Sequence, residues 1–187
     1  MPFNMPTMPS LSEQVQQLVD DAAAATAAAR NEATLRHRLE NALERSSVAL
    51  GLPWYPLQLD AVLVTGDRQK RFVDVAHGAI VIEYEAPRRF GGHGGAELDH
   101  ARAQAEEYAG LLAAEEGRSL KDYTLVAWDG AHISFGRYES EGAAWDHLTT
   151  FNRAAATQLL RLLRDDGTPI IHPALLAAIA GPDSEYG

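Results

Sequence analysis

The sequence predicts an α/β (α+β) domain in which helices flank a central mixed sheet that contains a three-strand meander. Three features predict this fold class. The first fifty residues carry apolar side chains at helical spacing, three short runs rich in β-branched residues follow, and a further helical stretch leads to a strand-turn-strand pattern. Because helices and sheets each have an apolar face to bury, packing the helices on the sheet satisfies both.

The length of 187 residues, with 46% hydrophobic and 22% charged residues, is typical of one globular domain. We predict a disordered leader over residues 1–9, one domain over residues 10–165, and a C-terminal connector with a short helix over residues 166–187. No internal repeat is visible in the sequence.

Two helices are predicted in the first quarter of the chain. Ser10 followed by Glu13 has the pattern of a capping box, so the first helix should begin near residue 10. The alanine-rich segment over residues 20–30 has high helix propensity and continues that helix. The next segment should stay helical to about Leu50, because Gly51 then ends it.

Three short β runs over residues 57–65, 71–76 and 79–86 come next. The turn-forming segments GDRQK and His77-Gly78 separate them. This spacing predicts an antiparallel meander.

The second half of the chain begins with the glycine-rich GGHGG and a helix that Gly117 ends. Asp129-Gly130, a dipeptide typical of tight hairpins, then joins two predicted strands. A last long helix is predicted from about Ala144 to Arg164.

Composition limits the classes of function. The chain has no cysteine, which excludes disulfides, thiolate metal ligands and cysteine nucleophiles. The first residues lack the features of a signal peptide, and no uninterrupted apolar run of about 18 residues occurs, so we predict a cytoplasmic protein without membrane contact. The formal net charge of -10 argues against a free-standing module that grips nucleic acid with a broad basic surface.

Basic residues nevertheless cluster on either side of the third β run, at Arg68, Lys70, Arg71, Arg88 and Arg89. These side chains either keep the strand ends soluble or contact phosphate groups of DNA. The sequence leaves both interpretations open.

The segment VIEYEAP, residues 81–87, has the character of a buried strand and yet carries two carboxylates. Successive strand side chains alternate between faces, so Glu83 and Glu85 should point to one side and Tyr84 to the other. Two like charges in partly dry surroundings repel, and a cation, a proton or open water must relieve them.

Asp74 lies nine residues before Glu83, so a hairpin that turns at His77-Gly78 would bring these two acids together. With Glu85 they would form an oxygen-rich site suited to Mg²⁺ or Mn²⁺. Zinc is a poor fit because cysteine and paired histidines are absent. Each acid taken alone also has the ordinary interpretation of a surface charge.

Glu32 is a fourth candidate acid, suggested by helix geometry. Leu35, Leu39 and Leu43 follow it at spacings that place the carboxylate within one apolar stripe. The alternative is that Glu32 lies near a break in the helix and reaches water. Glu40 lies toward the flank of the stripe and is predicted to be solvated.

Gln104 and Tyr108 are four residues apart on the helix after the meander, so they share a face and could lean toward the same sheet edge. The ordinary interpretation is a tyrosine packed on the core beside a solvated glutamine.

Taken in order, the helical Glu32, the strand residue Asp74, the Glu-x-Glu strand and the helix with QAEEY (residues 104–108) resemble the PD-(D/E)XK nuclease superfamily. The sequence is most similar to the branch with a Gln-x-x-x-Tyr helix, as in RecB-type nucleases and the N-terminal nuclease domains of large restriction enzymes. The resemblance covers about residues 31–138. It implies a restriction-endonuclease-like core of helix, three-stranded meander, helix and further strand.

The resemblance also implies a role for each candidate residue. Asp74 and Glu83 would ligate a divalent metal ion, and Glu32 would complete the shell directly or through water. Gln104 and Tyr108 would orient the site or the DNA backbone.

One position departs from the pattern, because the usual third motif ends in lysine and this chain has Glu85. The lysine ordinarily helps to position and activate the attacking water. Some restriction endonucleases of the superfamily carry Glu-x-Glu instead. A second acid could bind another ion, or hold the water and accept its proton.

The expected function is Mg²⁺- or Mn²⁺-dependent DNA cleavage by the nuclease domain of a bacterial restriction or anti-phage defence enzyme. The tail resembles the connector that follows such domains in long restriction proteins, which implies an ATPase or methyltransferase as a further part that supplies DNA affinity. The alternative is a nuclease-like fold that has lost catalysis and serves as an interaction or assembly module. The missing lysine and the acidic charge favour that alternative.

Overall fold

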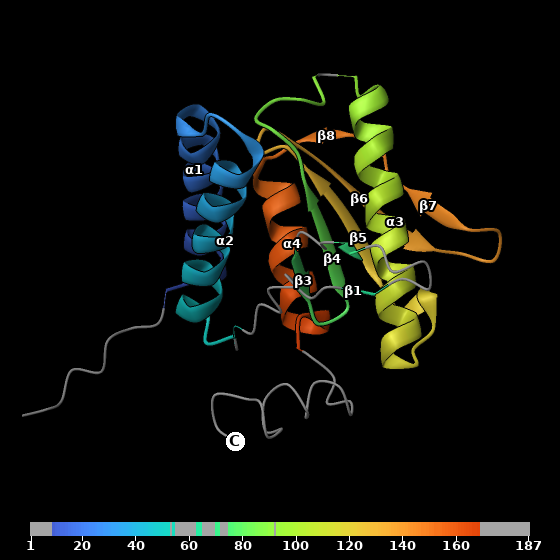
Figure 1. Cartoon of the computed structure of the whole chain (residues 1–187). Helices are drawn as coiled ribbons and strands as arrows, with labels where there is room; N and C mark the ends of the chain where they lie inside the picture. The colour runs from blue at the N-terminus through green and yellow to red at the C-terminus, as the bar shows by residue number, and fades with distance from the viewer. Residues whose placement is uncertain are drawn as a thin grey trace, which may run out of the picture.

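The computed structural model describes residues 9–52, 54, 63–64, 70–71, 75–91 and 93–168 (Figure 1). In chain order the elements are α1 (Leu11–Ala28), α2 (Glu32–Ala49), β1 (Leu63–Val64), β2 (Lys70–Arg71), β3 (Val75–His77), β4 (Ile80–Tyr84), α3 (Ala96–Glu116), the short 3-10 helix η1 (Leu120–Asp122), β5 (Thr124–Trp128), β6 (His132–Tyr138), β7 (Ala143–Trp145), β8 (Thr149–Thr150) and α4 (Arg153–Asp166).

The central sheet is mixed, as predicted. Its strands lie in the order β3-β4-β5-β6-β7, and β8 also pairs with β6. β4 and β5 are parallel, whereas the other pairs of this sheet are antiparallel. Parallel neighbours need a crossover connection, and α3 supplies it. The strands β1 and β2 form a separate antiparallel pair.

Helices cover both faces of the sheet, which confirms the predicted α/β class (Figure 1). Apolar residues of α1, α2 and α4 form one core cluster with Ile80, Ile82 and Tyr84 of β4. Val81 belongs to a cluster with residues of α3. The side chains of β4 therefore alternate between two buried faces, as the sequence predicted.

The predicted start of the first helix near Ser10 and the predicted end of the second near Leu50 are confirmed, since α1 begins at Leu11 and α2 ends at Ala49. Ser10 caps α1, and its side chain and that of Glu13 form the reciprocal pair of a capping box. Asn31 caps α2 by accepting a hydrogen bond from the Thr34 amide at 2.9 Å. The stripe of Leu35, Leu39 and Leu43 on α2 is fully buried.

Two tight turns lie where the sequence predicted them. Gly78, with φ of +57°, turns the chain between β3 and β4. Gly130, with φ of +82°, follows Asp129 between β5 and β6. Both backbone conformations fall in the left-handed region, which glycine adopts without steric cost.

The predicted helix from Ala144 to Arg164 is wrong in its first part, where the chain forms β7 and β8. The Asp146 amide donates to the Phe135 carbonyl at 2.7 Å, which ties this segment to β6. Asn152 caps α4, because its side chain accepts from two amides of the first turn. The helix then continues to Asp166, two residues beyond the predicted end.

Several predicted features lie outside the described residues: the leader up to residue 8, most of the β run over residues 57–65, and the connector beyond residue 168 with its short helix. No helix in the described part of the chain has the length and apolar character that a bilayer span requires.

Candidate functional site

The candidate site lies at the carboxyl ends of the parallel strands β4 and β5. Glu83 pairs in register with Ala127, and Tyr84 pairs with Trp128. The Glu85 amide then donates to the Trp128 carbonyl at 3.1 Å, which extends the pairing one residue past β4. In open α/β sheets, ligands bind at the carboxyl ends of parallel strands.

Glu83 is a buried carboxylate on the face of the sheet that α3 covers. Its side chain is 5% exposed. Ala127, its partner in the neighbouring strand, packs in a cluster with Leu98 and Ala101 from the first turns of α3. Burial of a carboxylate is costly unless hydrogen bonds, a proton or a cation compensate it, so this position is a strong candidate for chemistry.

The predicted acidic group falls only partly on described residues. Asp74 and Arg68 lie outside them, and Lys70 and Arg71 are described only as the backbone of β2. Glu85 is half-buried. Within the described ranges, no three His, Asp or Glu side chains are grouped as a metal site would require.

Glu32 is the first residue of α2 and is half-buried. One turn further, Leu35 lies against the turn after β5, since a Cβ at Gly130 would be 3.1 Å from Leu35 Cδ1. The start of α2 is therefore at the same end of the sheet as Glu83. The helix itself covers the opposite face, the one to which Tyr84 belongs.

Gln104 and Tyr108 lie on α3, over the same face as Glu83. Tyr108 is 7% exposed and belongs to a core cluster with Ala76 of β3 and Val81 of β4. Gln104 is half-buried. The core position expected for the tyrosine is confirmed, and the glutamine is less solvated than the ordinary interpretation required.

The loop after β4 presents Arg88 and Arg89 to solvent. Arg88 has a positive φ of 60°, and its amide donates to the Asp129 carbonyl at 3.2 Å. The Arg89 guanidinium lies 3.4 Å from the Glu97 carboxylate. A fixed backbone with exposed guanidinium groups is compatible with the predicted phosphate contact.

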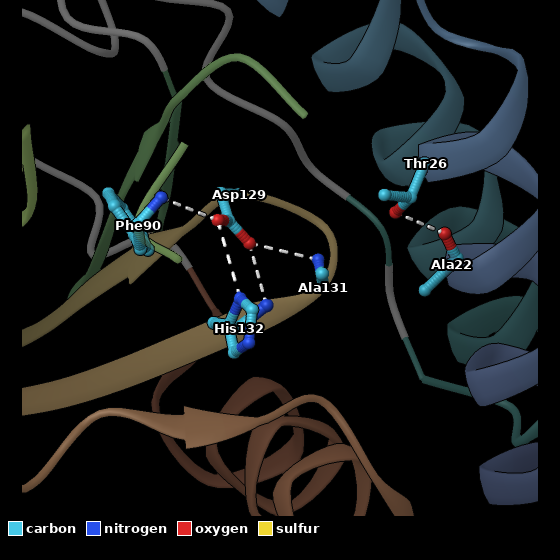
Figure 2. Close-up of polar contacts among 6 residues, drawn as sticks. All are labelled: Ala22, Thr26, Phe90, Asp129, Ala131 and His132. Carbon is cyan, nitrogen blue, oxygen red and sulfur yellow. Dashed lines mark hydrogen bonds and ion pairs between the residues drawn. The ribbon is translucent and has the colours of Figure 1, made fainter. Parts of the chain in front are cut away.

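Asp129 anchors this end of the sheet through the contacts shown in Figure 2. The sequence predicted only the turn at Asp129-Gly130 and not these contacts. Its side chain is fully buried. One oxygen accepts from the amides of Ala131 and His132, at 2.9 and 2.6 Å, and the other accepts from the Phe90 amide at 2.8 Å. This carboxylate therefore joins the loop after β4 to the turn after β5.

The prediction that Glu40 is solvated is wrong. Its side chain is only 17% exposed. The Tyr84 hydroxyl donates to Glu40 Oε1 at 2.5 Å, and His77 Nε2 lies 3.1 Å from Oε2. The Trp54 ring packs on His77 with the ring centroids 4.5 Å apart. The helix stripe alone could not reveal these partners, which lie on β3 and β4.

The fold and its polar groups thus define a mixed α/β protein with a candidate site at the carboxyl ends of two parallel strands. No known family model, curated protein or solved structure matches the chain.

Proposed function

We propose that the chain is a metal-dependent DNA endonuclease domain of the PD-(D/E)XK type, from a bacterial restriction or anti-phage defence enzyme. The observation that carries this proposal is Glu83, a nearly fully buried acid at the end of a strand beneath the helix that bears Gln104 and Tyr108.

The topology supports a restriction-endonuclease-like core. An N-terminal helix is followed by antiparallel strand pairs, by the crossover helix α3, and by a strand parallel to β4. The resemblance implies a three-stranded meander before this helix, whereas the described residues form two separate antiparallel pairs, β1–β2 and β3–β4. Since one fold can host many functions, the acids and not the topology carry the expected activity.

The proposal pairs Glu83 with Asp74, which lies outside the described residues. Within the described residues the register ends at Val75 opposite Ile82. Asp74 precedes the first of these residues in sequence, and Glu83 follows the second. The proposal requires the antiparallel pairing to extend by one residue, which would place the two carboxylates side by side on the α3 face.

The donor set fits a hard divalent cation, because it consists of carboxylates and lacks thiolates. Asp74 and Glu83 would hold Mg²⁺ or Mn²⁺, and Glu32 would complete the shell directly or through water. Bound there, the ion would polarise the scissile phosphate and lower the pKa of a water molecule.

The remaining side chains would act directly on water and DNA. Glu85, half-buried at the strand end, would hold the attacking water and accept its proton while the 3′ oxygen leaves. Arg88 and Arg89 would hold a flanking phosphate. Gln104 and Tyr108 would orient the site or the DNA backbone from α3.

We infer a larger cytoplasmic protein around this domain. A net charge of -10 repels DNA except at local arginine clusters, so most DNA affinity would come from other parts, such as an ATPase or methyltransferase. The second candidate function is an inactive nuclease fold that serves as an interaction or assembly module. Glu85 in the place of the usual lysine is the observation that favours it.

Metal binding distinguishes the two functions. Calorimetric titration with Mn²⁺ and thermal unfolding should show that the wild-type chain binds the ion, with about 2.7 kcal/mol of stabilisation when free Mn²⁺ reaches about 100 times its Kd. Glu83→Ala should remove this stabilisation and should abolish DNA cleavage by the full-length protein.

Glu44→Ala is the matched control, because Glu44 is an exposed acid on α2 away from the strand ends. It should leave both readouts unchanged. If the wild-type chain shows no Mn²⁺-dependent stabilisation, and the full-length protein cuts DNA equally well with Glu83→Ala, the proposed site is wrong.

A further inference from the structure

A buried polar bridge connects α2 to the β3–β4 hairpin. It consists of Glu40 on α2, His77 on β3 and Tyr84 on β4, and we call it the α2 bridge. The Tyr84 hydroxyl donates to Glu40 Oε1 at 2.5 Å, and His77 Nε2 lies 3.1 Å from Glu40 Oε2 and 3.3 Å from Oε1.

The two strand residues of the α2 bridge are buried, and Glu40 is 17% exposed. Tyr84 is 0% exposed and His77 is 1% exposed. Trp54 packs on the His77 ring. Hydrogen bonds to a charged acceptor are strong and directional in such surroundings, and loss of one partner weakens the contacts between α2 and the hairpin. The three side chains come from three elements, so they fix the orientation of α2 relative to both strands of the hairpin.

Each strand residue of the α2 bridge lies close in sequence to a predicted metal ligand. Tyr84 directly follows Glu83, and His77 lies three residues after Asp74. Odd spacings along a strand place side chains on opposite faces. A strand that is held by Tyr84 on the α2 face therefore presents Glu83 to the α3 face in one fixed orientation.

The third bridge residue shares a helix with the remaining predicted ligand. Glu32 begins α2, and Glu40 lies eight residues further along the same rigid element. The buried leucine stripe of α2 packs on the face of the sheet that contains Ile80 and Ile82. A shift of α2 along the sheet would move Glu32 relative to Glu83, and the α2 bridge opposes that shift.

We propose that Glu40 is a positioning residue for the metal site, acting through Tyr84 and His77 to set the position of Glu83 relative to Glu32. This inference rests on the proposed function. Polar groups that orient metal ligands without touching the ion are often required for affinity, and their loss typically costs about 10- to 100-fold in metal binding.

The test is a variant series in the full chain with two readouts, the Mn²⁺ Kd from calorimetry and the urea midpoint of unfolding in the absence of metal. Glu40→Ala should weaken Mn²⁺ binding at least about tenfold. Glu40→Gln should recover part of this loss, since its amide oxygen still accepts from Tyr84. Tyr84→Phe is the mildest variant and should weaken binding without preventing folding. The double variant Glu40→Ala with Tyr84→Phe should bind no more weakly than Glu40→Ala alone, since both changes break the same contact.

Leu43→Val is the matched control, because Leu43 is a buried residue of α2 that takes no part in the α2 bridge. It should lower the urea midpoint and leave the Kd of the folded protein unchanged. If Glu40→Ala lowers the midpoint in the same way but keeps the wild-type Kd, the bridge is only structural and the inference is overturned, while the proposed function stands. If the wild-type chain binds no Mn²⁺, the proposed function fails, and the inference fails with it.

Discussion

The two ends of β4 are built differently. At its start, backbone hydrogen bonds hold the strand to the end of α4 and to β5. The Ala79 amide donates to the Asp166 carbonyl at 2.9 Å, and the Thr124 amide donates to the Ala79 carbonyl at 2.9 Å. At its other end, polar side chains converge. Glu83 is buried there, Glu85 is half-buried, and the loop that follows presents two exposed arginines.

This difference indicates which end of β4 is the better candidate for a binding site. Backbone contacts at the first end satisfy the Ala79 and Thr124 amides and the carbonyl oxygens of Asp166 and Ala79. The second end is formed by the carboxyl ends of two parallel strands, where loops can present side chains on a rigid support. We call the two regions the closed end and the open end of β4.

The largest expected effect is at the closed end. Gly78→Ala would place a Cβ against the Asp166 carbonyl oxygen and 2.7 Å from the Thr168 carbonyl oxygen, at a φ of +57°. Backbone strain of about 1–2 kcal/mol and overpacking of about 1–3 kcal/mol should together lower the free energy of unfolding by about 2–5 kcal/mol. Urea denaturation measures this loss.

Gly117→Ala is the matched control, because Gly117 also has a positive φ, of +67°, but no neighbouring atom lies within 4 Å of the position that an added Cβ would take. It should cost only the strain of about 1–2 kcal/mol. Equal losses in the two variants would show that the contact with α4 does not close this end. Loss of Mn²⁺ binding by the folded Gly78 variant would show that the two ends are not independent.

A smaller effect is expected at the open end, where Asp129 accepts three backbone hydrogen bonds. Asp129→Ala should lower the free energy of unfolding by about 3 kcal/mol, because the buried Phe90 amide left without an acceptor costs about 1–3 kcal/mol and the half-buried amides of Ala131 and His132 lose their acceptor as well. Asp129→Asn should cost less. Its amide oxygen can still accept from Ala131 and His132, whereas its NH₂ group would face the Phe90 amide.

Amide hydrogen exchange separates these outcomes. In the Asn variant, exchange at Phe90 should accelerate while His132 stays protected, and in the Ala variant both should accelerate. Wild-type stability in both variants would contradict the assignment of Asp129 as the anchor between the loop and the turn.

The sequence predicted those parts of the molecule that depend on local chemistry. The Asp129-Gly130 turn follows from the conformational freedom of glycine next to an acid that can accept backbone hydrogen bonds. The alternation along VIEYEAP follows from strand geometry, and it correctly assigned Tyr84 to the face opposite Val81. Such features need no knowledge of distant residues.

The features that the sequence missed depend on distant partners. The helix pattern predicts only how near Glu40 lies to the apolar stripe, and from this position alone it was expected to be solvated. Its partners His77 and Tyr84 are 37 and 44 residues away in sequence, so the helix pattern could not indicate them. Trp145, Leu148 and Phe151 are spaced like a helix face, yet pairing with β6 makes this segment extended. The metal group remains a prediction, since Asp74 lies outside the described residues.

The smallest expected effect concerns alkaline pH and returns to the closed end, where Tyr123 directly precedes β5. Burial, and then the hydrogen bond from its hydroxyl to Glu116 Oε2 at 2.7 Å, raise the pKa of Tyr123 well above its usual value, while Arg118 opposes this. A group whose pKa is higher in the folded state stabilises the fold fully below its unfolded pKa, about 10, and loses this contribution as pH rises further. Stability should therefore fall above pH 10, by up to about 1.4 kcal/mol per pH unit for this group.

Tyr123→Phe should be slightly less stable at pH 8 and should show a shallower fall between pH 10 and 11.5 in urea titrations. Burial also raises the pKa of Tyr138, so Tyr138→Phe is measured beside it and should leave the Tyr123 part of the slope in place. An unchanged slope in the Tyr123 variant would show that its hydroxyl does not couple the closed end to pH.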